Sequence, residues 1–167
     1  MKNLENLTPA EMLHLKKTLS HIALLIAGAD GNIDAEEIAW ADKLTNIRGY
    51  SGEKWLQAFY DDVHADFLTD FNAARETFPA ETAARQEALA LEISSVNPIL
   101  EKLDPATAYK MYHSFVTFSE SIAKSSGGIL GFGSISRAES KWVGLPMINA
   151  IAEPPHKPMS EEENDEA

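Results

Sequence analysis

Hydrophobic side chains along this chain recur every three or four residues, which is the spacing of one face of an α-helix. Two segments show this pattern most clearly, and no stretch of any length alternates with the two-residue period of a half-buried strand. The first stripe consists of Met12, Leu15, Leu19, Ile22 and Ile26, and the second of Met111, Phe115, Phe118 and Ile122. The pattern predicts an all-α fold.

Capping residues and helix breakers divide the chain into about seven to eight helices. Thr8 is followed by Pro9 and, three residues after the threonine, by Glu11, which is the sequence pattern of a capped helix start. Ser51 is the expected cap of the third helix. We expect helices over residues 9–29, 35–48, 51–63, 69–78, 80–96 and 105–125, a short turn that Asn97 caps, and a last helix from Ser136 through Trp142.

The chain is organised around residues 22–42, where an apolar helix end is followed by an Asp-Gly break and an acidic helix start. Asp30 and Gly31 end the first helix, because glycine reaches left-handed backbone angles without a Cβ clash. Asp34 then caps the next helix, and Glu37 lies three residues later, where its carboxylate can accept from the N–H of the cap. Two helices therefore meet at a short acidic corner.

The same residues match the second half of an EF-hand calcium loop, with the pattern D-G-x-I-D-x-x-E. In that alignment Glu37 takes the last position of the loop, while Ile26 and Gly28 fall at its first and third positions. Neither of these can supply the side-chain carboxylate that those positions require. The corner is therefore not a complete EF-hand.

The segment I-A-G-A-D-G-N-I-D-A-E-E-I, within residues 19–44, resembles the signature of the TerB-like family. This family is named for tellurite-resistance protein TerB and includes the N-terminal domain of a membrane-bound DnaJ-type co-chaperone. The resemblance implies an all-α fold of internally related helices, an acidic surface near the corner, suspected metal-ion binding, and a role in stress response without established catalysis. Elsewhere only the helical layout and a second corner support it.

Two interpretations of the acidic corner are open. In the first, Asp34 and Glu37 form a capping box, which is worth about 1 kcal/mol and needs no ligand. In the second, Asp30, Asp34 and Glu37 bind a divalent cation, Ca²⁺ or Mg²⁺, through carboxylate oxygens, with water completing the coordination. Asp30 favours the second interpretation, because it lies outside the cap and its position suggests no structural role.

The two hydrophobic stripes align at a constant offset, so that residues 15–31 match residues 111–127. After an insertion of G-I-L-G-F-G in the second copy, Trp40 matches Trp142. We interpret the chain as two copies of one helix-corner-helix unit whose long helices pack together. The second corner has serines at the places of both aspartates, so a cation site belongs to the first.

Charge and composition narrow the function. Asp and Glu together number 26 and Lys and Arg 14, giving a net charge of -12 that repels a nucleic-acid backbone, so we expect no nucleic-acid partner. There is no cysteine for a disulfide or a thiolate ligand. The N-terminus lacks the apolar core of a signal peptide, and the longest strongly apolar run, residues 22–27, is too short to span a membrane. We therefore expect a cytoplasmic protein without a transmembrane segment.

At 167 residues the chain is long enough for one core. We expect one TerB-like helical domain over residues 1–152, followed by a disordered acidic tail over residues 153–167, where prolines precede S-E-E-E-N-D-E-A.

The sequence contains no recognisable catalytic set. His14 and His21 lie seven residues apart on one helical face, but the five histidines lack the tight spacing of a zinc motif. The S-I-A-K at residues 121–124 lacks the companion motifs of serine acyl enzymes. Because no nucleophile, base and orienting group can be assembled, we expect a protein that is not an enzyme.

Ile129, Leu130 and Phe132 stand in a glycine-rich segment, residues 127–134, which cannot be helical. This segment either folds back over the core or docks a protein or membrane surface. We expect a non-enzymatic stress-response or signalling module that binds a divalent cation at the first corner. The alternative is a metal-free helical scaffold that docks a protein partner or a membrane-associated complex.

Overall fold

All regular structure is helical in the computed structural model, over the residues that it describes, namely 2–33, 35–50, 52–125 and 137–155. The elements in chain order are η1 (Lys2–Leu4), α1 (Pro9–Ala27), α2 (Ala35–Gly49), α3 (Lys54–Thr77), α4 (Thr82–Ser94), α5 (Asn97–Leu100), α6 (Pro105–Ser125) and α7 (Arg137–Ser140). The all-α prediction is confirmed. The count of seven to eight helices and their TerB-like grouping stay predictions.

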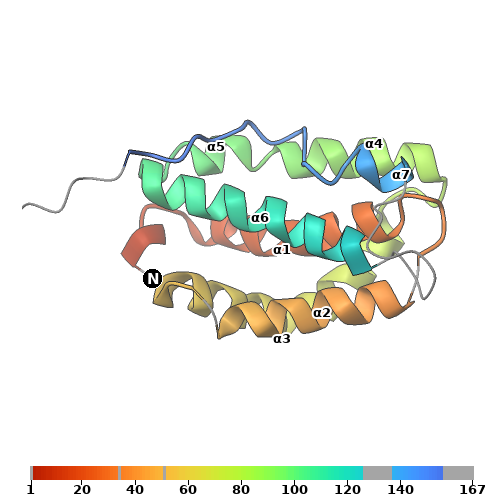
Figure 1. Ribbon diagram of the computed structural model, residues 1–167, viewed down its shortest axis with the longest axis horizontal. Helices are drawn as coiled ribbons and strands as arrows, with labels where there is room; N and C mark the ends of the chain where they lie inside the picture. The colour runs from red at the N-terminus through yellow and green to blue at the C-terminus, as the bar shows by residue number, and fades with distance from the viewer. Residues whose placement is uncertain (1, 34, 51, 126–136, 156–167) are drawn as a thin grey trace, which may run out of the picture.

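Helix α1 forms the centre of the bundle, with α4 and α6 on one side and α2 and α3 on the other (Figure 1). Every residue from Thr18 to Ala27 is buried, including the polar ones. A helix that is apolar all round packs against neighbours on all sides, which explains the apolar run at residues 22–27. The buried hydroxyl of Ser20 donates to the carbonyl oxygen of Phe67 over 3.2 Å.

The predicted start of α1 is confirmed. Thr8 Oγ1 accepts a hydrogen bond from the N–H of Glu11 over 3.3 Å, and the Glu11 carboxylate accepts from the N–H of Thr8 over 2.9 Å. Lys102 also binds this carboxylate, and that hydrogen bond, together with those from Thr8, lowers the pKa of Glu11 to about 2. At the start of α6, the Asp104 carboxylate accepts a hydrogen bond from the N–H of Thr107 over 3.1 Å.

The two helices predicted over residues 51–63 and 69–78 are one continuous helix, α3, so this prediction was wrong. The buried stripe of α3 passes through Val63, Phe67 and Phe71 at intervals of four residues, with no glycine or proline between them. Because the apolar spacing crosses the predicted break, burial of the stripe keeps the helix whole.

Two further predictions near the C-terminus are corrected. Asn97 does not cap α5 but is its first residue, and its side chain binds the C-terminal segment instead. Helix α7 ends at Ser140, so Trp142 lies in a turn and not in a helix. A glycine and a proline follow within a few residues, and neither continues a helix well. The predicted caps Ser51 and Ser136 lie outside the described residues.

The buried hydrophobic residues form one cluster, which reaches from Leu4 in η1 to Ile148 near the C-terminus. Residues 153–155 continue without regular structure, and the rest of the predicted acidic tail, residues 156–167, lies outside the described residues. The domain boundary at residue 152 stays a prediction. Within the described parts of the chain, no helix combines the length and the apolar character needed to cross a membrane.

Candidate functional site

The candidate site is the corner between α1 and α2. Gly28 follows the last residue of α1, and its N–H donates to the carbonyl oxygen of Leu24 over 3.1 Å. Gly31 has a φ of +96°, which confirms the predicted left-handed break, since side-chain-bearing residues rarely adopt such angles. The helix itself ends before the predicted break, and turns connect it to Gly31.

Asp30 is exposed at this corner and has a structural role that the sequence prediction missed. Its Oδ1 accepts a hydrogen bond from the N–H of Asn32 over 2.8 Å, which makes an Asx turn. An aspartate next to a turn glycine was the available signal for this role. Among the residues that the structure describes, no lysine or arginine forms an ion pair with Asp30.

Two side chains of α4 brace the corner. Arg85 is 6% exposed and donates to the carbonyl oxygen of Gly28 over 3.2 Å, while Gln86 donates to that of Ala29 over 2.8 Å. The guanidinium thus lies at the C-terminal end of α1, where unpaired carbonyls carry partial negative charge. A Cβ on Gly28 would lie 2.8 Å from the carbonyl oxygen of Leu24 and 3.2 Å from Arg85. The close contact therefore requires glycine.

Of the three predicted metal ligands, the structure describes Asp30 and Glu37, whereas Asp34 lies outside the described residues. Glu37 is half-buried in the first turn of α2, beside the exposed Glu36. The described residues contain no group of three or more His, Asp or Glu side chains that could hold a metal ion. Both the three-ligand site and the capping box include Asp34, so both stay predictions. The carboxylate donors suit a hard cation such as Ca²⁺ or Mg²⁺.

His14 and His21 have different surroundings, although both lie on α1. His14 Nε2 is 2.7 Å from Ser95 Oγ, and His14 Nδ1 is 3.6 Å from the Glu92 carboxylate. This resembles a Ser-His-acid set, but the Ser95 hydroxyl also donates to the main-chain oxygen of Glu92, so its proton is not directed at the imidazole. His21 is buried edge-on to Phe78, with 5.3 Å between ring centroids.

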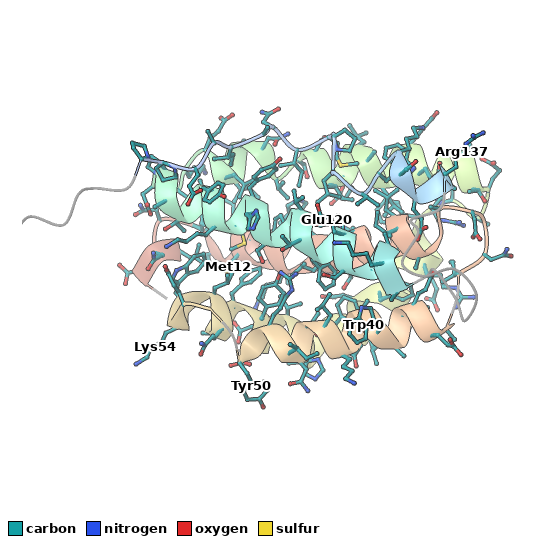
Figure 2. All side chains as sticks on the ribbon, viewed as in Figure 1. Met12, Trp40, Tyr50, Lys54, Glu120 and Arg137 are labelled. Atoms are coloured by element: carbon teal, nitrogen blue, oxygen red, sulfur yellow. The ribbon has the colours of Figure 1, made fainter. Side chains whose placement is uncertain are left out.

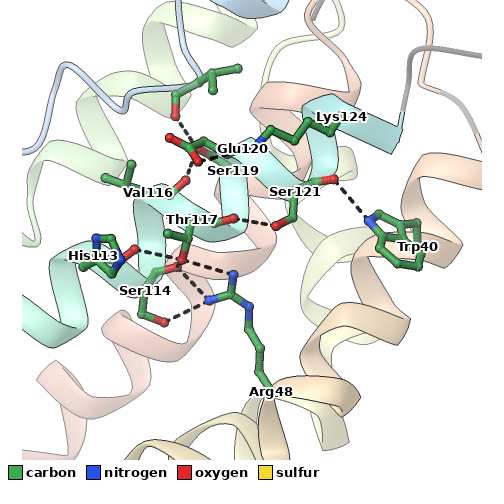
Figure 3. A network of polar contacts seen from close by, with 11 residues as sticks. Trp40, Arg48, His113, Ser114, Val116, Thr117, Ser119, Glu120, Ser121 and Lys124 are labelled. Carbon is green, nitrogen blue, oxygen red and sulfur yellow. Dashed lines mark hydrogen bonds and ion pairs between the residues drawn. The ribbon is translucent and has the colours of Figure 1, made fainter. Parts of the chain in front are cut away.

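A polar network joins α2 to α6 in the interior of the bundle (Figure 3). Trp40 Nε1 donates to the carbonyl oxygen of Ser121 over 3.2 Å, and the guanidinium of Arg48 donates to Ser114. The Tyr60 hydroxyl of α3 is 2.6 Å from Ser114 Oγ, and burial raises the pKa of Tyr60. Sequence periodicity did not single out Arg48 or Tyr60, because the network connects helices far apart along the chain.

Several features bear on the predicted repeat. Helices α1 and α6 lie side by side, and their matched stripes are equally buried (Figure 1). However, α2 has 15 residues and its counterpart α7 has 4. Trp40 is half-buried, whereas Trp142 is 7% exposed. Since the second corner falls in residues 126–136, outside the described residues, the repeat stays a prediction. Ile129, Leu130 and Phe132 also lie outside the described residues, so their predicted role as a docking segment stays a prediction.

The fold and the corner define an all-helical protein with an acidic turn braced between two of its helices. The chain matches no protein-family model, no curated protein and no solved structure. The resemblance to the TerB-like family therefore rests on the segment within residues 19–44.

Proposed function

We propose that the chain is a non-catalytic TerB-like module of stress response or signalling, which binds a divalent cation at the α1–α2 corner through Asp30, Asp34 and Glu37. The observation that carries this proposal is the exposed carboxylate of Asp30, which a braced turn holds just before the acidic start of α2. An anionic group without a lysine or arginine partner among the described residues attracts cations in a protein of net charge -12.

The bracing by Arg85 and Gln86 supports the proposal further. A turn that is already fixed loses little conformational freedom when an ion binds, so more of the interaction free energy contributes to affinity. Three carboxylates on a short corner leave several coordination positions to water. The expected affinity is accordingly weak.

A melting experiment with conservative amide variants tests the site. Asp30→Asn keeps the Asx turn, because an amide oxygen also accepts from the N–H of Asn32, and Glu37→Gln keeps the capping pattern. We expect Ca²⁺ or Mg²⁺ to raise the melting temperature of the parent protein and not that of the double variant. The matched control, Asp66→Asn, removes an exposed carboxylate of α3 and should respond like the parent. A parent protein whose melting temperature does not change with metal contradicts the proposal.

The second candidate is a metal-free helical scaffold that docks a protein partner. It is favoured by Ile47 in the last turn of α2 and by Tyr50 directly after the helix, which are 45% and 83% exposed. Figure 2 shows Tyr50 pointing away from the bundle, in contrast to Trp40, which points inward. A double change of Tyr50 and Ile47 to serine should leave stability unchanged and abolish binding of a co-purified partner, with no effect of metal. Retained binding argues against this surface.

A further inference from the structure

The C-terminal strap, which we define as residues 141–155, returns along the bundle beside α6 and α5 (Figure 1). It contains turns but no helix. Four of its side chains are nevertheless buried in the core, namely Trp142, Val143, Leu145 and Ile148. Turns within the strap pair part of its main chain, as where the N–H of Leu145 donates to the carbonyl oxygen of Trp142 over 2.8 Å, and neighbouring elements supply further hydrogen bonds.

Side chains of the groove bind the main chain of the strap. The Asn97 amide donates to the carbonyl oxygen of Met147 over 3.1 Å and accepts from the N–H of Asn149 over 2.8 Å. From the other wall, the Ser119 hydroxyl of α6 donates to the carbonyl oxygen of Val143. Proteins that bind extended peptides likewise hold the peptide main chain by hydrogen bonds and take alternate side chains into pockets. The groove between α5 and α6 has the first feature, and it buries four side chains of the strap at irregular spacing.

Leu145 shows how firmly the groove holds the first half of the strap. Its φ is +49°, an angle that a bulky residue adopts at a cost of about 1–3 kcal/mol. Its side chain is completely buried. The strained backbone persists because the surrounding contacts outweigh its cost.

The second half of the strap fills the groove incompletely. A cavity of about 200 Å³ lies where Asn149 and Ile151 face Leu100 and Leu103. A more open groove of about 550 Å³ lies between residues 153–155 and Tyr109 of α6. Both hollows are open to solvent, and residues 149–155 are exposed or half-buried, so we expect this end of the strap to open more readily than residues 142–148.

We propose that the groove between α5 and α6 is a peptide-binding groove that exchanges its own strap for the strap of a second copy of this chain. The groove binds residues 141–155 of its own chain. An identical segment from another molecule can make the same contacts, so a second copy is the occupant that we propose. Exchange of an identical element is a low-cost route to a dimer for that reason. This inference does not depend on the proposed cation site.

Binding of the strap in trans is tested with the full-length chain and a fluorescent peptide of residues 141–155. In the parent protein the attached strap competes at an effective concentration of about 1 mM, so the peptide should bind weakly. Ile148→Asp weakens the attached strap and should tighten peptide binding at least about tenfold. Adding Asn97→Ala should reverse most of that gain, because both main-chain hydrogen bonds of the amide are lost.

Two controls make the result specific. Ile47→Asp adds the same charge at a partly exposed position of α2 and should leave peptide binding at the parent level. A peptide of the same composition in scrambled order should not bind. An Ile148→Asp chain with unchanged helical circular dichroism that fails to bind the strap peptide overturns the proposal, and so does equal binding of the scrambled peptide.

Dimer formation tests whether the strap of a second copy occupies the groove between α5 and α6. Asn97→Ala damages the groove and leaves the strap intact, whereas Ile148→Asp does the reverse. A mixture of the two variants, refolded together at high concentration, should therefore form a heterodimer in analytical ultracentrifugation, and each variant alone should form fewer dimers. A mixture that stays monomeric at every concentration contradicts the exchange.

Hydrogen exchange of the unmodified chain covers the case in which Ile148→Asp does not fold. The buried N–H of Ile148, which donates to the carbonyl oxygen of Leu145 over 2.9 Å, should exchange through a local opening. Its opening free energy should be clearly below that of buried amides in α1, such as that of Ile22. Equal values mean that the strap opens only with global unfolding, and the proposal then fails.

Discussion

Arg48 of α2 donates a hydrogen bond from Nη1 to the main-chain carbonyl oxygen of Ser114 in α6, over 3.1 Å (Figure 3). The same guanidinium donates from Nη2 to Thr117 Oγ1 over 3.1 Å and lies 5.4 Å from the centre of the Tyr60 ring. The planar fork therefore satisfies two acceptors on successive turns of α6 while stacking on an aromatic ring of α3. One side chain thus connects three helices.

Replacing Arg48 by methionine should lower the free energy of unfolding by about 2 kcal/mol, since the hydrogen bonds that its charged guanidinium donates to Ser114 and Thr117 are lost. Arg48→Lys should recover less than half of this, because one ammonium cannot reach both acceptors in the same geometry. Urea denaturation measures the difference. The control Arg75→Met, on the exposed face of α3, should change stability little. Equal stability of all three variants argues against the network.

Gly31→Ala should destabilise the protein by about 1–2 kcal/mol, because a residue with a Cβ is strained at positive φ. The added Cβ would also lie 3.2 Å from Thr82 Oγ1. Gly144→Ala is the matched control: its Cβ meets nothing within 4 Å, and its φ is not positive. Thermal melting of the two variants separates them. If they melt together, the corner tolerates a side chain and the left-handed break is not required.

The helical layout was predictable because the information for it is local. The spacing of Leu19 and Ile22, or of Phe115 and Phe118, reports one buried face, and Thr8 with Glu11 reports a helix start. The predicted gap between residues 63 and 69 was wrong, because the buried stripe continues through Phe67 and keeps α3 whole.

The bracing of the corner was not predictable from the sequence. Arg85 lies in the segment that was predicted only as a helix over residues 80–96, and its role depends on α4 packing against the end of α1. The Asn97 contact with the strap has the same origin, since its partners are about 50 residues away in the sequence. Periodicity identifies which face of a helix is buried, but it does not identify which polar groups meet there.

Arg85→Met should lower the free energy of unfolding by about 2–4 kcal/mol, because its removal leaves the carbonyl oxygens of Gly28 and Ala80 without this buried donor. Gln86→Ala should cost less, since that side chain makes one neutral hydrogen bond to the corner. Faster hydrogen exchange at the end of α1 should accompany the loss. If Arg85→Met is no worse than Gln86→Ala, the guanidinium does not brace the corner.

Acid sensitivity should come from His21, whose buried Nδ1 finds no hydrogen-bond partner in the described part of the chain. Burial, and then the charges of His14 and Lys17, lowers the pKa of His21 from 6.5 to about 4. The unfolded chain therefore takes up the proton first as the pH falls. The stability that neutral His21 contributes is fully present above about pH 6.5 and is lost between about pH 6.5 and about pH 4, by at most about 3 kcal/mol.

His21→Leu should abolish this loss, because leucine fills the buried position without a group that titrates or an unpaired nitrogen. The comparison is the change in melting temperature between about pH 7 and about pH 5, which should be large in the parent and small in the variant. Glu11 does not confuse the result, because its lowered pKa places its own loss of stability mainly below this window. His113→Gln, at an exposed position of α6, should behave like the parent. If His21→Leu loses as much stability as the parent over this range, another group must carry the acid sensitivity.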